Sequence, residues 1–125
     1  MILGLGIDIV NISRIESLLE KWRDRFINRI FTPKEIEYCI NKKFASRHFA
    51  ARFAAKEAFL KALGVGLGYG ISLKDIEITN NSIGSPSIEL HRKAEETCRK
   101  RNIKNIFLSL SHDGEYGVAQ VILEG

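Results

Sequence analysis

Glu57 and Lys61 stand out as charged side chains on a predicted helix, residues 49–63, that is apolar nearly all round. Such a helix belongs in the middle of a fold, where a charge is costly unless a partner or a ligand neutralises it. The two residues lie four positions apart and therefore share one face of the helix. They either form an ordinary intrahelical ion pair, which is the commoner arrangement, or take part in a binding site.

Glycines at positions 64, 66, 68 and 70 follow directly after this helix. Glycine lets a backbone approach a ligand closely, and successive N–H groups can bind anionic oxygens. A carboxylate, an ammonium group and a glycine-rich loop together suggest a site for phosphate and a metal ion.

Asp8 is a second candidate carboxylate, because it lies in an apolar strand predicted over residues 2–10. Alternation along the strand predicts that its large side chains point into the core: Leu3, Leu5, Ile7 and Ile9. Gly4, Gly6 and Asp8 then form the opposite face, which something large can approach closely. A neighbouring subunit could cover this face, or the chain's own central helix or hairpin could do so.

A basic helix is predicted over residues 14–28, after a capping box formed by Ser13 and Glu16. Three of its basic residues fall together: Arg14, Lys21 and Arg25. Residues 11–61 hold twelve Lys and Arg against six Asp and Glu, so this half of the chain should face an acidic partner. A solvated charged surface is the usual explanation of such a run.

The rest of the chain completes a single α+β domain spanning residues 1–125, with a small antiparallel sheet packed with helices. The patterns predict a short helix capped by Thr32, strands at 76–80 and 87–90, a helix at 91–101 and a closing hairpin at 106–123. His112 lies at the end of a hairpin strand, where it could contact a phosphate or shuttle a proton. Its neighbour Ser111 would point to the opposite face, which argues against a serine hydrolase arrangement.

Composition and termini indicate an ordinary globular protein. The N-terminal segment has no basic leader and is typical of a strand, not of a signal peptide. No run of apolar residues is long enough to cross a membrane. Cys39 and Cys98 lack the spacing of metal ligands and are expected to be reduced thiols. We therefore expect a cytoplasmic protein.

Three segments resemble the signature blocks of the holo-acyl-carrier-protein synthases, the small bacterial 4′-phosphopantetheinyl transferases: GIDIV at 6–10, RFAAKEAFLKALG at 52–64 and SLSH at 109–112. The resemblance covers essentially the whole chain. It implies transfer of 4′-phosphopantetheine from coenzyme A to a serine of apo-acyl carrier protein, with release of adenosine 3′,5′-bisphosphate, in fatty acid biosynthesis. It also implies a Mg²⁺ cofactor and a homotrimer with active sites at subunit interfaces.

The same resemblance implies roles for individual residues. Asp8 and Glu57 correspond to the Mg²⁺ ligands and, with Lys61 near the pyrophosphate, form the catalytic set. The expected coenzyme A contacts are Arg52, Lys61, Gly64, Gly66 and, near the 3′-phosphate, His112. The expected carrier-protein contacts are Arg14, Leu18, Lys21, Arg25 and Phe26. Glu57, Asp8 or a metal-bound water could take the proton of the attacking serine.

One turn departs from the family pattern, and two other functional classes compete with this interpretation. Gly84, Ser85 and Pro86 stand where the family usually has Gly-Lys-Pro, so Ser85 removes a basic contact. A basic module that binds nucleic acid or an acidic protein without catalysis would explain the basic helix, but no recognised nucleic-acid-binding motif is present. A structural or adaptor domain would leave Asp8 and Glu57 without a purpose. We expect neither nucleic acid nor membrane as a partner.

Overall fold

The structure is a computed structural model that describes residues 1–65 and 70–125. Gly66 and Gly68 of the predicted glycine loop therefore lie outside the described residues. The elements follow in the order β1 (Ile2–Asn11), α1 (Ile12–Ile30), α2 (Pro33–Ile40), α3 (Ala45–Leu63), the 3₁₀ turn η2 (Leu73–Asp75), β2 (Ile76–Asn80), β3 (Pro86–Leu90), α4 (Arg92–Lys100), β4 (Asn105–Asp113) and β5 (Tyr116–Glu124).

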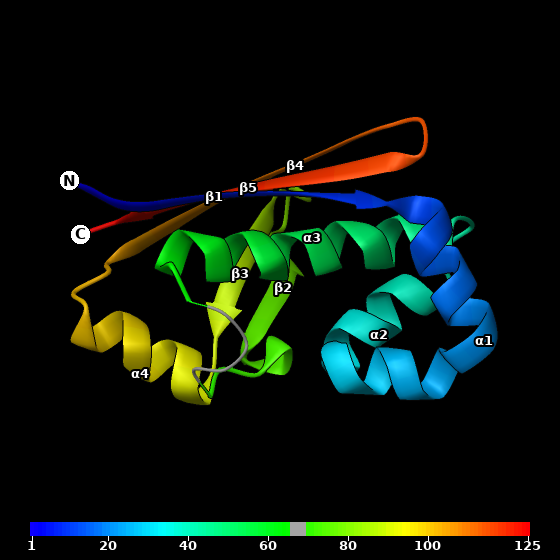
Figure 1. Cartoon of the computed structure of the whole chain (residues 1–125), viewed down its shortest axis with the longest axis horizontal. Coiled ribbons are helices and arrows are strands. Elements are labelled where there is room, and N and C mark those ends of the chain that lie inside the picture. The colour runs from blue at the N-terminus through cyan, green and yellow to red at the C-terminus, as the bar shows by residue number, and fades with distance from the viewer. Residues whose placement is uncertain (66–69) are drawn as a thin grey trace.

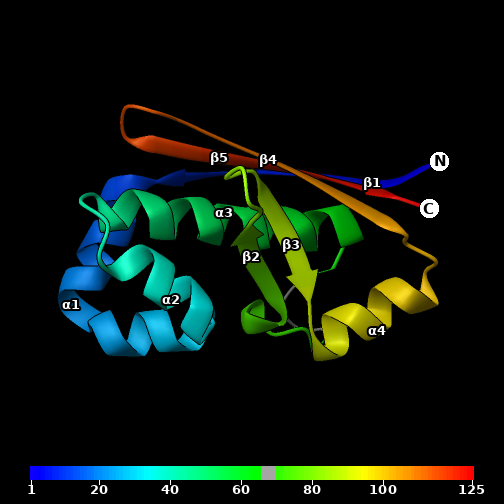
Figure 2. The same ribbon diagram turned by 180° about the vertical axis from the view of Figure 1, so that it is seen from behind.

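Helix α3 lies between two layers, as Figures 1 and 2 show from opposite sides. On one side is an antiparallel sheet in the order β1-β5-β4. On the other side α1 and α2 lie toward one end of α3 and α4 lies toward the other end, while the β2–β3 pair crosses beside α3 and its turn reaches the sheet near β4. The predicted α+β class and the buried central helix are both confirmed, since Ala50, Ala54 and Ala58 are fully buried.

The prediction for the two faces of β1 is wrong. Leu5, Ile7 and Ile9 are 60%, 58% and 63% exposed, and the glycine face packs against α3 instead. A Cβ atom on Gly6 would lie 1.9 Å from the carbonyl oxygen of Ala58, and one on Gly4 would lie 2.1 Å from that of Ala62. The strand backbone is so close to the helix that only glycine fits, and the chain's own central helix covers the face.

Local capping explains where the first two helices begin. Asn11 caps α1, because its side chain accepts hydrogen bonds from the backbone N–H of Ser13 at 2.9 Å and from the Ser13 hydroxyl at 2.6 Å. The predicted Ser13–Glu16 capping box is therefore wrong. The start of α2 matches the prediction, with Thr32 as the cap in a capping box with Glu35.

The closing hairpin is confirmed, with Asp113 of β4 opposite Tyr116 of β5. Among the helices of the described residues, none is long and apolar enough to cross a membrane.

We predict that Gly6→Ala destabilises the fold by about 1–3 kcal/mol, the usual cost of forcing an extra group into a packed contact. The added methyl group would meet the α3 backbone, which cannot move as a flexible side chain can. Urea unfolding measures the change.

Gly117→Ala on β5 is the matched control, because its Cβ would meet Val10 at an ordinary 3.6 Å. Equal unfolding midpoints for the two variants would contradict the close approach of β1 to α3.

Candidate active site

Asp8, Glu57 and Lys61 come together where β1 lies against α3. The Nζ atom of Lys61 donates to Oδ1 of Asp8 at 2.9 Å and to the carbonyl oxygen of Ile7 at 3.1 Å. Within the described residues the ion pair of Lys61 is thus with β1 and not with Glu57 on its own helix. Glu57 and Lys61 of α3 and Asp8 of β1 therefore form one charged group.

The electrostatics of this group favour a cation. Burial raises the pKa of Glu57, the nearby charge of Asp8 raises it further, and Lys61 partly offsets both effects. A positive ion beside the two carboxylates would offset the charge of Asp8 that disfavours the ionised form of Glu57. Carboxylate oxygens from two elements are also the donors that Mg²⁺ takes in proteins, usually with phosphate oxygens and water completing the set. Asp8 and Glu57 therefore fit the predicted metal ligands.

A hollow of about 260 Å³ opens beside the two carboxylates. Asp8 and Glu57 line it together with Arg14 and Leu18 of α1 and Phe53 of α3. The basic helix therefore begins next to the acidic pair. A group bound along α1 can reach the carboxylates without crossing the protein.

The hollows continue along α1. Arg14, Leu18 and Lys21 line a hollow of about 350 Å³, and Leu18, Arg25 and Phe26 line the next, of about 340 Å³. All five predicted carrier-protein contacts therefore line neighbouring hollows along α1, and we call this row of hollows the groove along α1. The groove also contains Trp22 and Arg29, which the sequence analysis did not select. Trp22 is half exposed, and the α1 backbone is non-helical at this residue, a kink with no local sequence signal.

Away from the hollows along α1, a hollow of about 470 Å³, called the second hollow below, lies between α3, the β2–β3 turn and β4. It brings together two of the predicted coenzyme A contacts, Arg52 and His112, and the predicted turn Gly84, Ser85 and Pro86. Its other polar residues include Tyr38, His48, Asn80, Ser109 and Ser111. Burial lowers the pKa of His48, and nearby cationic groups, Arg52 among them, lower it further. Such a cationic environment suits an anionic ligand.

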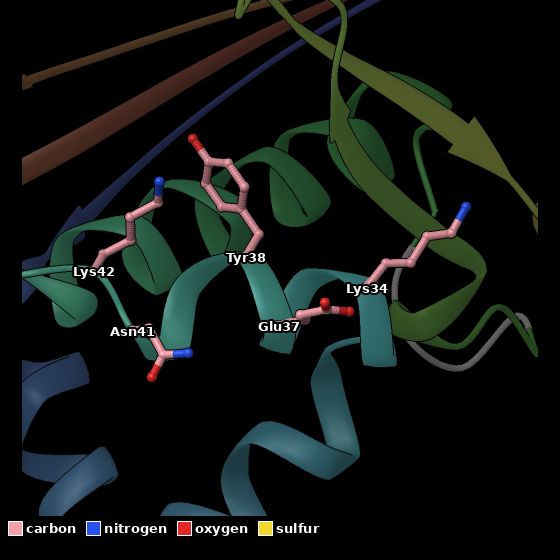
Figure 3. A pocket seen from close by; sticks show the side chains of 5 residues that line it. All are labelled: Lys34, Glu37, Tyr38, Asn41 and Lys42. Atoms are coloured by element: carbon pink, nitrogen blue, oxygen red, sulfur yellow. The ribbon is translucent and has the colours of Figure 1, made fainter.

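The exposed side of α2 forms a further hollow of about 470 Å³, shown in Figure 3. Its lining residues are Lys34, Glu37, Tyr38, Asn41 and Lys42. The Nζ atom of Lys42 lies 4.5 Å from the centre of the Tyr38 ring, and Cζ of Arg52 lies 4.1 Å from it. Tyr38 lines both hollows and connects α2 to the Arg52 site.

The predicted coenzyme A contacts do not meet at one place in a single chain. Lys61 lies with Asp8, whereas Arg52 and His112 line the second hollow. Lys61 and Arg52 are nine residues apart on α3, which is about 13.5 Å along the helix axis. Gly64 ends α3 in the left-handed conformation, with φ at 73°. Gly66 lies outside the described residues.

Lys56 is a buried charge that the sequence analysis missed. Its Nζ atom donates to Oε1 of Glu35 at 2.8 Å and to the carbonyl oxygens of Leu73 at 2.8 Å and Ile76 at 2.7 Å. Glu35 in turn accepts from the backbone N–H of Thr32 and, on β2, from that of Ile78. This fully buried ion pair joins α2, α3 and β2 one residue before Glu57. The available signal was a second basic residue four positions after Arg52, on the same face of a helix that is apolar nearly all round.

Another group of potential metal ligands lies on the β2–β3 pair and the N-cap of α4. Atoms of Glu77, Glu89 and His91 lie within 4.8 Å of one another. Nε2 of His91 lies 3.1 Å from one oxygen of Glu77, and the Thr32 hydroxyl donates to the other oxygen. These hydrogen bonds satisfy Glu77 inside the protein, and the group is separate from Asp8 and Glu57.

Comparison with known proteins gives one consistent result. The sequence model of the 4′-phosphopantetheinyl transferase superfamily matches residues 4–121. A curated protein of Geobacter sp. (strain M21), named holo-[acyl-carrier-protein] synthase, is 54% identical over 124 residues, which cover 99% of each chain.

Solved structures agree. The holo-[acyl-carrier-protein] synthase of Neisseria meningitidis has a TM-score of 0.92 and 34% identity, with 100% of both chains covered. That of Helicobacter pylori, solved in complex with coenzyme A, has a TM-score of 0.85 and 38% identity, with 96% of this chain and 99% of that chain covered. The resemblance stated from the three sequence blocks is confirmed.

Proposed function

The chain belongs to the 4′-phosphopantetheinyl transferase superfamily, and on this premise we propose that it converts apo-acyl carrier protein into its holo form. It transfers 4′-phosphopantetheine from coenzyme A to a serine hydroxyl of the carrier and releases adenosine 3′,5′-bisphosphate. The observation that carries this proposal is the group of Asp8, Glu57 and Lys61 at the end of the basic groove. Two carboxylates and an ammonium group there suit phosphate chemistry.

Asp8 and Glu57 are the proposed ligands of Mg²⁺. When bound, the ion neutralises negative charge on the phosphate oxygens. The chain's own part is to hold the two carboxylates on rigid elements, a strand and a helix, so that they need no rearrangement to bind.

Lys61 is proposed to bind the pyrophosphate of coenzyme A. The serine oxygen forms a bond to the β-phosphorus, and the bond from that phosphorus to the leaving adenosine bisphosphate breaks. Charge develops on the bridging oxygen, and an ammonium group stabilises it most when it is already held in place. Asp8 holds Lys61 in this way, at 2.9 Å. The proton of the serine goes to a nearby base.

Arg52 and His112 are proposed to bind the 3′-phosphate end of coenzyme A in the second hollow. Arg52 supplies a permanent positive charge. The turn beside it is neutral at Ser85, where the family usually has a lysine. Gly64 and Gly66 remain predicted contacts to the same ligand.

The groove along α1 is proposed to bind the carrier protein. Leu18 and Phe26 provide apolar contact, and Arg14, Lys21 and Arg25 provide positive charge for an acidic surface. This groove leads to Asp8 and Glu57, so a docked carrier would bring its serine to the reaction site. A basic module without catalysis would use the same groove, but it gives no reason for two adjacent carboxylates beside it.

We propose a homotrimer with the active sites at subunit interfaces. The outer face of the sheet carries exposed apolar side chains on its two edge strands, which flank β5: Leu5, Ile7 and Ile9 on β1 and Phe107 on β4. An apolar face of this kind is typical of a surface that a partner covers. A shared site would also unite Lys61 of one chain with Arg52 and His112 of another. Buried free thiols at Cys39 and Cys98 are consistent with the predicted cytoplasmic location.

The reaction and its metal ligands are tested together. The wild-type chain, incubated with coenzyme A, Mg²⁺ and apo-acyl carrier protein, should add one phosphopantetheine group to the carrier, seen by intact mass. Asp8→Ala and Glu57→Ala should each lower the rate at least about a hundredfold, because each removes an oxygen ligand of the ion. EDTA should do the same reversibly. Wild-type turnover in either folded variant would refute the ligand assignment.

The carrier groove is tested by charge reversal. Arg25→Glu should raise KM for the carrier protein about tenfold and leave coenzyme A binding unchanged, because a reversed charge repels an acidic partner. Added salt should weaken the wild-type contact, since exposed charges are screened beyond ~10 Å at 0.1 M. Arg99→Glu on α4, a similarly exposed arginine, is the control. Weaker coenzyme A binding by Arg25→Glu would place this helix in the coenzyme site instead.

The assembly is tested by mass and by mixing. Light scattering should give about three times the chain mass of 14.1 kDa. Ile7→Glu should give the monomer, because it puts a charge on the outer sheet face. Asp8→Ala and His112→Ala, refolded together, should regain part of the activity if chains share sites. No recovery from a verified mixed oligomer would mean that each chain holds a complete site.

A further inference from the structure

The side chain of Asn80 connects two of the elements that line the second hollow, α3 and the β2–β3 turn. Its Oδ1 atom accepts a hydrogen bond from Nη2 of Arg52 on α3 at 2.7 Å. Its Nδ2 atom donates to the carbonyl oxygen of Gly84 in the β2–β3 turn at 2.9 Å. One amide therefore holds both the cation and the turn that line this hollow.

Arg52 is an unusual buried charge. The residue is only 4% exposed, and within residues 1–65 and 70–125 it forms no ion pair with a carboxylate. Its Nε atom is buried without a hydrogen-bond partner among the same residues. The ring of Tyr38 lies 4.1 Å from Cζ and offers only a cation–π contact. No carboxylate of these residues neutralises the guanidinium, so its positive charge is available to an anionic ligand in the hollow.

We propose that Asn80 is a positioning residue for coenzyme A, which orients the Arg52 guanidinium into the second hollow and fixes the turn at Gly84 beside it. The inference rests on the proposed function, because it takes the anion to be a phosphate of coenzyme A. A preformed site of this kind avoids the cost of ordering a long cationic side chain when the ligand binds.

The chemistry of the amide explains why an asparagine suits this place. A neutral amide oxygen can orient a guanidinium without cancelling its charge. An aspartate would also accept from Nη2, but its own charge would pair with Arg52 and repel the phosphate. Asn80→Ala and Asn80→Asp both lose the donor to the Gly84 carbonyl, so the difference between the two variants reports on the charge beside Arg52.

The test measures the Kd of coenzyme A by titration calorimetry. Asn80→Ala should weaken binding about tenfold, which corresponds to one hydrogen bond to a charged group. Asn80→Asp should weaken it more, although it preserves size and an acceptor for Arg52. A purely structural role of the bond to the Gly84 carbonyl, which both variants lose, predicts equal losses of coenzyme A binding, and that result would overturn the proposal. Asn80 is exposed at the end of β2, so we expect all variants to fold, which their unfolding midpoints will check.

Asn81→Ala is the matched control. Asn81 supports the same turn through hydrogen bonds from the N–H groups of Ile83 and Ser85 but does not contact Arg52 through any hydrogen bond of the described residues. Its Kd should stay within about twofold of the wild type. An equal loss for Asn81→Ala would mean that turn stability, and not Arg52, is responsible, and would overturn the proposal.

A double-mutant cycle with Arg52→Gln completes the test. If Asn80 acts through Arg52, Asn80→Ala should cause little further loss in the Arg52→Gln background. Additive losses would overturn the inference. A wild-type chain that fails to modify the carrier would instead refute the proposed function. Normal transfer with unchanged coenzyme A binding in the Asn80 variants would refute only the positioning role.

Discussion

The close approach of β1 to α3 is the constraint on which the site depends. Gly6 lies against the backbone of Ala58, and any side chain at this strand position would collide with the helix. Asp8 follows two residues later on the same face of the strand, so it is held against the same helix. Glu57 immediately precedes Ala58 on α3 and therefore lies near the contact. The carboxylates meet because two backbones pack without side chains between them, and no loop is needed to position them.

The opposite side of α3 is fixed by a buried ion pair. Lys56, next to Glu57 in sequence, turns away from β1 and pairs with Glu35 under the helix. Such a pair adds little net stability, because removing both charges from water costs about as much as their attraction returns. Its value lies in geometry, since a rotation or a slide of α3 would leave a charge buried without a partner. Gly6 on one side and Lys56 on the other thus set the orientation of Glu57.

Much of the fold and of the candidate site could be predicted from local sequence signals. The features that could not be predicted depend on contacts between residues far apart in the sequence. Thr32 was identified as a helix cap because its partner is three residues away. Asp8 and Glu57 were identified because each is a carboxylate in an otherwise apolar segment, where an unpaired charge is costly unless it binds something. Lys56 and the role of Asn80 were missed, because their partners lie 21 and 28 residues away in sequence. The faces of β1 were reversed because alternation defines two faces without saying which one meets the core.

The reversed faces of β1 also have a consequence for assembly. If glycine must face α3, period-two alternation places the large residues of β1 on the outside. Leu5, Ile7 and Ile9 are therefore exposed by the same contact that positions Asp8. Fully burying such a side chain is worth ~1.5–3 kcal/mol of free energy. Covering this face of the sheet with another protein surface would therefore be favourable. The position of Asp8 and the exposed apolar face that we propose a second chain covers thus have one origin, and a strand with large residues facing inward would lose both.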